Sequence, residues 1–540
     1  MYKNRVRGGG ERGERANDRE ASMVKAQPTY TRRSCGEGAR SYPGRSRITP
    51  ERATARERWS EKSAEVVVAD DGEGPNGEES ETDVSLEGAK PQMTGQLELP
   101  LWGRGEAPRA QRSEEAPTAA NETERSGTSD LMELVCERQN LQAALKRVRK
   151  NKGSPGIDGM TVEELSEHLR AHWSVLREQL LSGTYRPTLV KRQLIPKSGG
   201  GIRELGIPTV LDRFIQQAVL QVLQPRFDPS FSQHSHGFRP GKRAHDAVVE
   251  AQQYIQGGRR FVVDVDLEKF FDRVNHDVLM SRLAKRIEDR RLLGLIRRYL
   301  EAGILANGVV VERHEGTPQG GPLSPLLANV LLDEVDKELE KRGHAFVRYA
   351  DDCNVYVRSK RAGERVMGLL RRLYARLRLR INEAKSAVDL AVRRKILGYS
   401  FWIAPGQVVK RRVASKALGV MKERVRLITK RAGGRSVQQV VAELRSYLIG
   451  WKGYFRLADT PGAFATMDEW IRHRLRAIHL AHWKRGTTIF RELRARGLSV
   501  RSAATVARNG RRWWKNSGML IHVAFPIRYF DELGLPRLAS

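Results

Sequence analysis

The stretch FVRYADDCNVYV, Phe346 to Val357, places two adjacent carboxylates, Asp351 and Asp352, between two runs of apolar residues. The alternation on either side predicts two strands, and charge in the middle of a buried strand is costly. We therefore expect a β-hairpin with both Asp side chains at its tip. Asp is common in turns, so the pair alone fits either a solvated turn or a functional site.

A second acidic segment favours the functional site. A strand predicted at Phe261–Val265 runs into Asp266, and Asp264 and Asp266 alternate with valines so that both project from the same face. Asp266 alone would be read as a turn residue at a strand end. If the sheet brings it beside the hairpin, however, the carboxylates repel one another, and divalent cations usually compensate. Mg²⁺ suits oxygen ligands, and two such ions can clamp an in-line displacement at phosphorus.

The composition indicates a nucleic-acid partner. The 540 residues contain 96 Lys and Arg against 64 Asp and Glu, a formal charge of +32, which favours a polyanion. No apolar run is long enough to cross a bilayer and no hydrophobic signal core begins the chain, so we expect a cytoplasmic protein without a membrane partner. The 3 cysteines include no C-x-x-C pair, which argues against a disulfide framework or a Cys-rich zinc site.

The N-terminal segment 1–130 is rich in Arg, Glu, Gly, Ser and Pro and predicts disorder. Its QLELPLW run (96–102) is a candidate hydrophobic anchor, and RGGGERGER is either an RNA-binding tail or, because Glu interrupts it, a plain solvated one. Met93 is an alternative start.

The folded body begins near Leu131, where a helical period runs to the Lys-Gly at residues 152–153, and a second helix is expected from about 162 to 181. LVKRQLIPKSGGGIRELGIPT then predicts two strands joined by a Gly-rich turn. Its basic residues fit two interpretations equally: a hairpin that folds over phosphates, or a Lys-protected sheet edge.

Beyond about Pro405 the chain reads as helical and basic. In the helix expected at 437–456, apolar residues recur at steps of four, three and four, which predicts a core stripe of Leu444, Leu448, Trp451 and Phe455. Further on, VARNGRRWWKNSGML clusters Arg and Lys beside two Trp residues and is a candidate DNA-binding segment.

These motifs resemble a known family. VDVDLEKFFD, GTPQGGPLSPLLANVLLDEVD and RYADD occur in the order and approximate spacing of reverse transcriptase palm motifs. KNKGSPGIDGMT, IPKSGGGIRELGIPT, HSHGFRPGKRAHDAV, LRINEAKSAV with KILGYSFW, and VVAELRSYLIGWKGYFRLAD resemble segments of bacterial group II intron-encoded reverse transcriptase/maturases. The resemblance covers about 131–540.

The family implies an α+β right-hand polymerase fold followed by an α-helical thumb/maturase domain. We expect fingers and palm at 131–405, the thumb/maturase (X) domain at 406–495 and a DNA-binding segment at 496–540. Pro322 would lie near the first turn of a helix that ends at about Glu340.

The resemblance also implies the roles of individual residues. The expected ligands of two Mg²⁺ ions are Asp266, Asp351, Asp352 and the backbone carbonyl of Leu267. The expected substrate contacts are Lys197 and Arg203 on the triphosphate, Gln319 in the nucleotide pocket, Lys385 near the leaving pyrophosphate, Arg239 on nucleotide or template, and Phe271 against the sugar, where it would exclude a 2′-OH. Phe271 also fits ordinary core packing. The implied reaction is attack of a primer 3′-oxygen on the α-phosphorus of a deoxynucleoside triphosphate.

The implied partners are a group II intron RNA, a DNA target and deoxynucleoside triphosphates, in the bacterial cytoplasm and at the nucleoid when on DNA. Many relatives carry a C-terminal HNH nuclease with paired cysteines, which residues up to Ser540 lack. We therefore expect the primer to come from elsewhere, such as a nascent strand at a replication fork.

Two other classes stay open. A non-intron reverse transcriptase of the defence or retron kind would share the palm but not explain the LIGWKGYFRLAD helix. A non-enzymatic RNA-binding splicing factor would explain the charge but not the three carboxylates.

Overall fold

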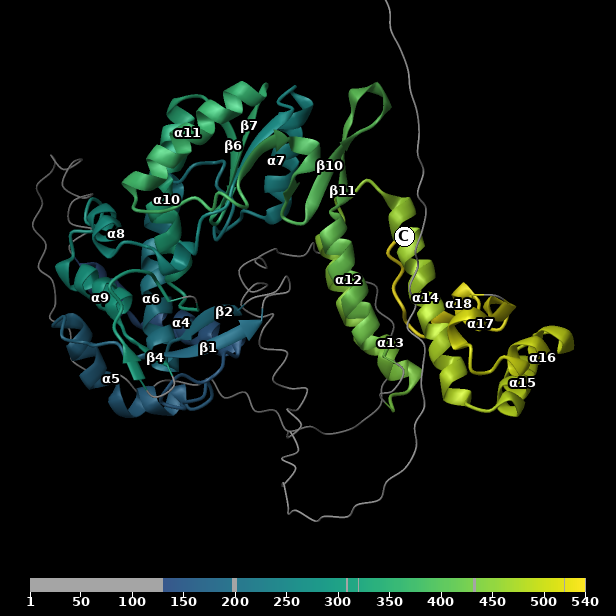
Figure 1. Cartoon of the computed structure of the whole chain (residues 1–540). Helices are drawn as coiled ribbons and strands as arrows, with labels where there is room; N and C mark the ends of the chain where they lie inside the picture. The colour runs from purple at the N-terminus through teal and green to yellow at the C-terminus, as the bar shows by residue number, and fades with distance from the viewer. Residues whose placement is uncertain are drawn as a thin grey trace, which may run out of the picture. The chain divides into compact units, whose positions relative to one another are not determined.

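The computed structural model describes residues 130–196, 202–306, 309–318, 320–430, 434–518 and 520–539, all within the unit Arg56–Ser540 (Figure 1). Residues 1–129 lie outside the described ranges. They include nearly all of the segment predicted to be disordered, with its candidate anchor at 96–102 and its RGGGERGER run. Lys197, Gln319 and the side chain of Arg203 also lie outside them.

The first helices form one body. They are α3 (Leu131–Val135), α4 (Arg138–Asn151), α5 (Leu165–Leu181) and α6 (Val210–Phe227). The prediction of a single helix from Leu131 onward is therefore wrong, because the helix is interrupted between α3 and α4. Glu137 takes an extended conformation there, and the N–H of Met132 donates to Asp289 Oδ2 at 2.9 Å, which docks α3 against the start of α9 (Arg290–Glu301).

The predicted basic hairpin is confirmed as β1 (Val190–Pro196) and β2 (Ile202–Ile207), which pair antiparallel. They continue into a sheet of order β2-β1-β4-β5, with β4 at Ile304–Ala306 and β5 at Val309–Val311. β1 and β4 run parallel.

A second, wholly antiparallel sheet has the order β6-β7-β3-β8. Its strands are β3 (Phe261–Val265, as predicted), β6 (Ala345–Tyr349), β7 (Asp352–Val357) and β8 (Ala387–Leu390). Because successive side chains of a strand face opposite sides, the sheet separates two cores. Val263, Val265 and Val355 pack into one core, and Val262, Val347 and Tyr356 pack into the other.

Helices cover both faces of this sheet. α10 (Ser324–Lys341) and α11 (Lys360–Arg376) contribute to the first core, and α7 (Ala244–Gln256) to the second. α11 packs against β3, β7 and β8 of this sheet (Figure 1). α10 begins at Ser324, so Pro322 precedes the helix and Pro325 occupies its first turn, which corrects the expected start. The Ser324 hydroxyl fixes this start by donating to the carbonyl of Pro318 at 2.8 Å.

A smaller sheet follows, made of β9 (Lys395–Ile396), β10 (Tyr399–Ile403) and β11 (Val409–Val413). The antiparallel β10–β11 pair spans the boundary predicted at residues 405 and 406. Helical structure therefore begins only at α12 (Ser415–Ile428).

The remaining helices are α13 (Val437–Tyr454), α14 (Pro461–Trp483), α15 (Gly486–Ala495), α16 (Val500–Arg508), α17 (Trp513–Ser517) and α18 (Ile527–Glu532). The predicted stripe of α13 is confirmed, because Leu444, Leu448, Trp451 and Phe455 are all buried. Phe525 and Phe530 join the same core, so residues beyond 496 pack with the preceding helices. None of the described helices is both long and apolar enough to span a bilayer.

Candidate active site

The strand register brings the two acidic segments together at one end of the antiparallel sheet. Val265 at the end of β3 pairs with Cys353 of β7, so Asp266 lies at the next position, opposite Asp352. β6 and β7 close with Tyr349 opposite Asp352, which leaves Ala350 and Asp351 as the turn. The expected hairpin tip is therefore confirmed, and Asp266 follows the neighbouring strand at the same end.

The turn is held in an unusual backbone conformation. Ala350 has a φ of 57°, in the left-handed region that residues with a Cβ rarely adopt. Gly237 packs directly against it, and a Cβ on Gly237 would lie 2.2 Å from the backbone nitrogen of Ala350. The close approach of residue 237 is possible only for glycine.

A buried ion pair supports the same turn from the protein interior. The Arg348 and Asp336 side chains are both 0% exposed, with Arg348 Nε 2.8 Å from Asp336 Oδ1 and Nη2 2.6 Å from Oδ2. Arg348 Nη1 donates to the carbonyl of Ala350 at 2.9 Å and to Asn329 Oδ1 at 2.8 Å. Asn329 Nδ2 in turn donates to the carbonyl of Gly237 at 2.9 Å. We call Arg348, Asp336, Asn329 and Gly237 the turn brace.

Sequence reasoning did not single out this brace. The available signal was an arginine at a strand position between apolar residues, in RYADD, where a charge must find a buried partner.

Asp266 is held by the turn that precedes β8. Its N–H donates to the hydroxyl of Ser386 at 3.0 Å, and its carbonyl accepts from the N–H of Asn382 at 2.8 Å. Lys385 Nζ lies 3.2 Å from Asp266 Oδ2. The structure thus puts Lys385 at the carboxylate end of the sheet, and its place near the leaving pyrophosphate stays a prediction.

The backbone carbonyl of Leu267 points into the same region. Leu267 and Ile381 form an antiparallel bridge whose hydrogen bonds come from their neighbours, Glu268 N–H to the Arg380 carbonyl and Asn382 N–H to the Asp266 carbonyl. In such a pair the two opposed residues turn their own N–H and C=O away from each other. The Leu267 carbonyl therefore faces the β7 side, where the hairpin tip lies.

The site is electrostatically crowded. Burial, followed by repulsion from Asp351, Asp264 and Asp266, raises the pKa of Asp352 to about 7. The Asp352 side chain keeps contact with solvent, so screening by water weakens the contribution of burial, and the repulsion is what a bound cation would relieve.

Asp264 is the more enclosed neighbour. Burial raises its pKa, and Arg394, whose Nε lies 2.8 Å from Asp264 Oδ2, partly offsets this rise. Asp264 thus has an arginine partner within the protein.

The donor set fits a hard divalent cation. Oxygen atoms of two carboxylates at opposed register positions, a third carboxylate in the turn and one backbone carbonyl are the ligand types that Mg²⁺ takes. In the described part of the chain no group of three His, Cys, Asp or Glu side chains is already gathered as an ion-binding cluster.

Phe271 lies in the short 3-10 turn Phe270–Asp272, which follows β3 and Asp266. Its ring is half-buried and meets Phe270 edge-on with centroids 5.0 Å apart. Its carbonyl accepts from the N–H of Thr317 at 2.7 Å, and Gly316 N–H donates to Val274 at 2.7 Å, so the loop that leads to residue 319 is tied beside Phe271. Gly316 has a φ of 90° and a Cβ there would lie 2.9 Å from the Asp272 carbonyl, so this junction requires glycine.

Arg239 has a different environment from the one expected. Its side chain is 3% exposed, with Nε 2.8 Å from Asp228 Oδ1 and Nη1 3.0 Å from the Ser235 carbonyl. The guanidinium is enclosed by the 228–235 segment, so its geometry gives no support to a nucleotide or template contact. Its place in the fold is that of a structural residue.

Comparisons with known proteins agree with this geometry. The family model described as reverse transcriptase (RNA-dependent DNA polymerase) matches residues 195–401, and the group II intron maturase-specific domain matches residues 418–497. The chain therefore combines a reverse transcriptase domain with a group II intron maturase domain, an arrangement that identifies it as a relative of group II intron-encoded proteins.

Curated relatives cover these regions in part. Protein YkfC of Escherichia coli is 37% identical over 39% of this chain and 57% of its own length. Group II intron-encoded protein LtrA of Lactococcus lactis is 38% identical over 36% of this chain and 32% of its length. The putative COX1/OXI3 intron 2 protein of Saccharomyces cerevisiae is 30% identical over 41% of this chain and 26% of its own length. The alignments thus span little more than half of these relatives at most.

Among solved structures, a chain of a partial Cas6-RT-Cas1–Cas2 complex aligns with 45% of this chain and 42% of its own, at 24% identity and a TM-score of 0.31.

Proposed function

We propose that this chain is an RNA-directed DNA polymerase that also binds a group II intron RNA to assist its splicing and mobility. The observation that carries the polymerase assignment is the register that sets Asp266 opposite Asp352, with Asp351 in the braced turn between β6 and β7. The maturase-specific match downstream favours the intron over a defence or retron role. A non-enzymatic splicing factor would have no use for the carboxylates and their brace.

In this proposal two Mg²⁺ ions, held by Asp266, Asp351, Asp352 and the Leu267 carbonyl, would supply charge stabilisation at the reacting phosphorus and oxygens. The protein residues do the positioning. The turn brace fixes Asp351, and the bonds from Ser386 and Asn382 fix Asp266. The expected contacts of Lys197, Arg203 and Gln319 with the incoming nucleotide remain part of the proposal.

Lys385 and Phe271 have distinct tasks in this mechanism. The Lys385 ammonium, beside Asp266, would neutralise charge that develops on the leaving pyrophosphate. The exposed part of the Phe271 ring would pack against the deoxyribose and leave no room for a 2′-OH. The substrates are a primer 3′-OH, an RNA template and deoxynucleoside triphosphates.

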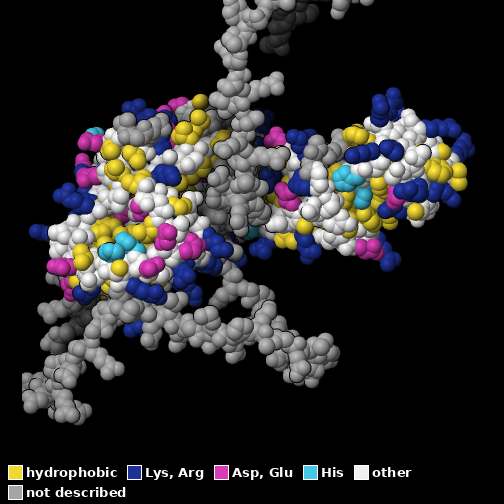
Figure 2. Space-filling view, turned by 90° about the horizontal axis from the view of Figure 1, so that it is seen from below, with side chains coloured by type: hydrophobic (Ala, Val, Ile, Leu, Met, Phe, Trp, Pro, Cys, Tyr) yellow, Lys and Arg dark blue, Asp and Glu magenta, His cyan; other side chains and the backbone are white. Residues whose placement is uncertain are grey.

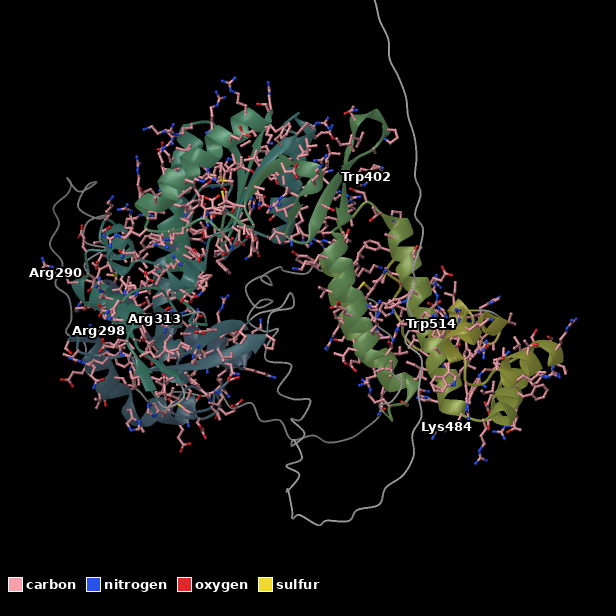
Figure 3. The ribbon with its side chains drawn as sticks, in the orientation of Figure 1. Arg290, Arg298, Arg313, Trp402, Lys484 and Trp514 are labelled. Carbon is pink, nitrogen blue, oxygen red and sulfur yellow. The ribbon has the colours of Figure 1, made fainter. Side chains whose placement is uncertain are left out.

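The C-terminal helices offer surfaces for nucleic acid. Figure 2 shows Lys and Arg gathered along the outer edge of the helical C-terminal part. Trp514, 42% exposed, stacks on His473 with centroids 3.8 Å apart, and Arg474 lies 6.0 Å from its ring (Figure 3). This exposed ring beside a cation is the feature that supports the proposed DNA-binding segment, whereas the neighbouring Trp513 packs on the core.

The test is single-nucleotide extension of a DNA primer on an RNA template in Mg²⁺. Asp266→Ala should reduce the rate by roughly 1,000-fold or more while RNA affinity stays close to wild type, because ligand loss leaves the basic surface intact. Asp389→Ala is the matched control, since Asp389 lies on β8 of the same sheet but outside the site. Extension by Asp266→Ala within tenfold of wild type would contradict the assignment.

A further inference from the structure

A basic hollow opens on the same sheet, at the end remote from the carboxylates. Its volume is about 500 Å³, and its lining includes five arginines: Arg259, Arg342, Arg358, Arg365 and Arg372. The residues that line it, all within the described ranges, include no Asp or Glu. We call this feature the arginine hollow.

The wall and rim of the hollow differ in character. α11 turns Ala362, Val366 and Leu369 inward, and Val366 and Leu369 are buried against the sheet. Arg365 and Arg372 lie two helical turns apart on the same side of α11, and both are exposed. Their spacing is roughly 10 Å along the helix axis. Figure 3 shows nitrogen-tipped side chains projecting outward from α11.

Most of these cations have no acidic partner among the residues that the structure describes. Arg342 pairs with Glu338, and Arg259 lies over the Tyr254 ring with 5.6 Å from its guanidinium carbon to the ring centroid. Arg358, Arg365 and Arg372 have no acidic partner among the described residues, where surface arginines elsewhere in the chain are widely paired. Burial, and secondly the charge of Arg342, lowers the pKa of His344 on the same rim. The hollow therefore keeps a net positive field.

The arginine hollow lies away from the carboxylates of the candidate active site. It is lined by Ala345 at the start of β6 and Val357 at the end of β7, whereas the turn at Ala350 and Asp351 joins the other ends. At about 3.3 Å per residue, five or six residues place the hollow roughly 15–20 Å from the carboxylates. A nucleotide bound in the hollow is therefore too far away to be the template nucleotide that pairs with the incoming deoxynucleotide.

We propose that the arginine hollow binds a looped or bulged nucleotide of a folded RNA, with its phosphates on the arginines and its base stacked on a guanidinium plane. Arginine suits this ligand because its planar fork pairs with phosphate oxygens and also stacks on a base. A hollow of this volume admits a nucleotide turned out of a helix, which folded RNA offers at loops and bulges and straight duplex DNA does not. The inference extends the proposed RNA-binding function by giving one contact a location on the polymerase domain.

The experiment compares two double variants across three nucleic acids. Arg365→Glu with Arg372→Glu changes the hollow. Arg170→Glu with Arg177→Glu is the matched control, because these residues are also exposed arginines seven positions apart on one helix, α5, without a partner in the described ranges. The probes are an RNA hairpin with a bulge, a fully paired RNA of the same length and the corresponding duplex DNA.

The hollow variant should lose about tenfold or more in affinity for the bulged RNA, and much less for the two paired probes. The milder Arg365→Ala with Arg372→Ala should lower the slope of log affinity against log salt by about 1.5 to 2, as two lost phosphate contacts require. The control should lose no more than about threefold on any probe. Melting temperatures should stay unchanged, since all four side chains are exposed.

Unchanged affinity of the hollow variant for bulged RNA, or an equal loss on all three probes, would overturn the proposal. Primer extension on a short primer–template is measured in parallel and should remain at the wild-type rate. If wild-type protein shows no extension at all, the polymerase assignment fails. The comparison of RNA affinities still tests whether the arginine hollow binds RNA.

Discussion

The two ends of the β6–β7 pair carry opposite charges that the protein treats in opposite ways. At the turn, the carboxylates Asp351 and Asp352 lie next to the fully buried Arg348–Asp336 ion pair. Contacts from Arg348 and Gly237 fix the backbone there. At the other end, Arg358, Arg365 and Arg372 extend into solvent with no acidic partner among the described residues. Groups that must align reacting atoms need rigid support, whereas cations that bind a polyanion act through charge and reach.

The largest expected effect comes from breaking the turn brace. Arg348→Leu would leave Asp336 as an uncompensated buried charge and cost about 3–5 kcal/mol of folding stability, seen as a lower midpoint in urea. Arg348→Leu combined with Asp336→Leu removes both charges and should recover much of this loss. The turn would still lack its bond to the Ala350 carbonyl, so kcat should remain low with little change in KM.

Recovery of kcat along with stability in that double variant would show that the ion pair serves folding alone. Arg342→Leu is the matched control for the other end of the strands, since Arg342 is exposed and its ion pair is the surface one with Glu338. Its effect on stability should not exceed about 1 kcal/mol.

Selectivity for deoxynucleotides should depend on Phe271. Phe271→Ala should reduce discrimination against ribonucleotides by roughly tenfold or more, because the ring supplies the bulk that opposes a 2′-OH. The measurement is the ratio of kcat/KM for the two nucleotides. Phe270→Ala, which empties a buried neighbouring position, should instead lower the melting temperature and leave the ratio unchanged. An unaltered ratio in Phe271→Ala would assign that ring to core packing.

A methyl group at Gly237 should disturb the turn without removing any polar group. Gly237→Ala places a Cβ 2.2 Å from the Ala350 nitrogen, so the turn must shift at a cost of about 1–3 kcal/mol. We expect kcat to fall by more than tenfold with KM nearly constant. Gly450→Ala, where the added Cβ meets nothing within 4 Å, is the control and should leave kcat unchanged. Wild-type kcat in Gly237→Ala would mean that the turn tolerates displacement.

The smallest expected effect is a pH dependence at Asp352. Because its pKa is raised to about 7 in the folded protein, its contribution to stability is present at low pH and is lost as pH rises through about 7. Without divalent cations, Asp352→Asn should therefore raise the melting temperature more at pH 8 than at pH 5. Saturating Mg²⁺ should remove this difference. A pH-independent difference between variant and wild type would contradict the repulsion among these carboxylates.

Local sequence pattern predicted the elements of the site but not their supports. Alternation around Asp351 and Asp352 located the hairpin, and the valines around Asp264 located β3. The helix break at Cys136–Glu137 was missed because the apolar period continues through it, whereas the structure gives Glu137 an extended conformation. The enclosure of Arg239 was missed because its partners, Asp228 and the Ser235 carbonyl, lie in irregular turns that no periodic pattern predicts.

The arginine hollow shows the same limit on a larger scale. Its arginines come from the loop before β3, the end of α10 and the region from the end of β7 through α11, and only the fold gathers them. No single window of sequence contains a pattern that distinguishes them from ordinary surface arginines.

The central claim is that polymerisation and the proposed RNA contact occupy opposite ends of the same two strands. It is tested most directly by measuring primer extension and bulged-RNA affinity side by side in Asp351→Asn and in Arg365→Glu with Arg372→Glu. The account predicts that Asp351→Asn loses extension by at least about 1,000-fold and keeps its RNA affinity, while the arginine variant keeps extension and loses affinity by about tenfold or more. Loss of both properties in either variant, with its melting temperature unchanged, would contradict the account.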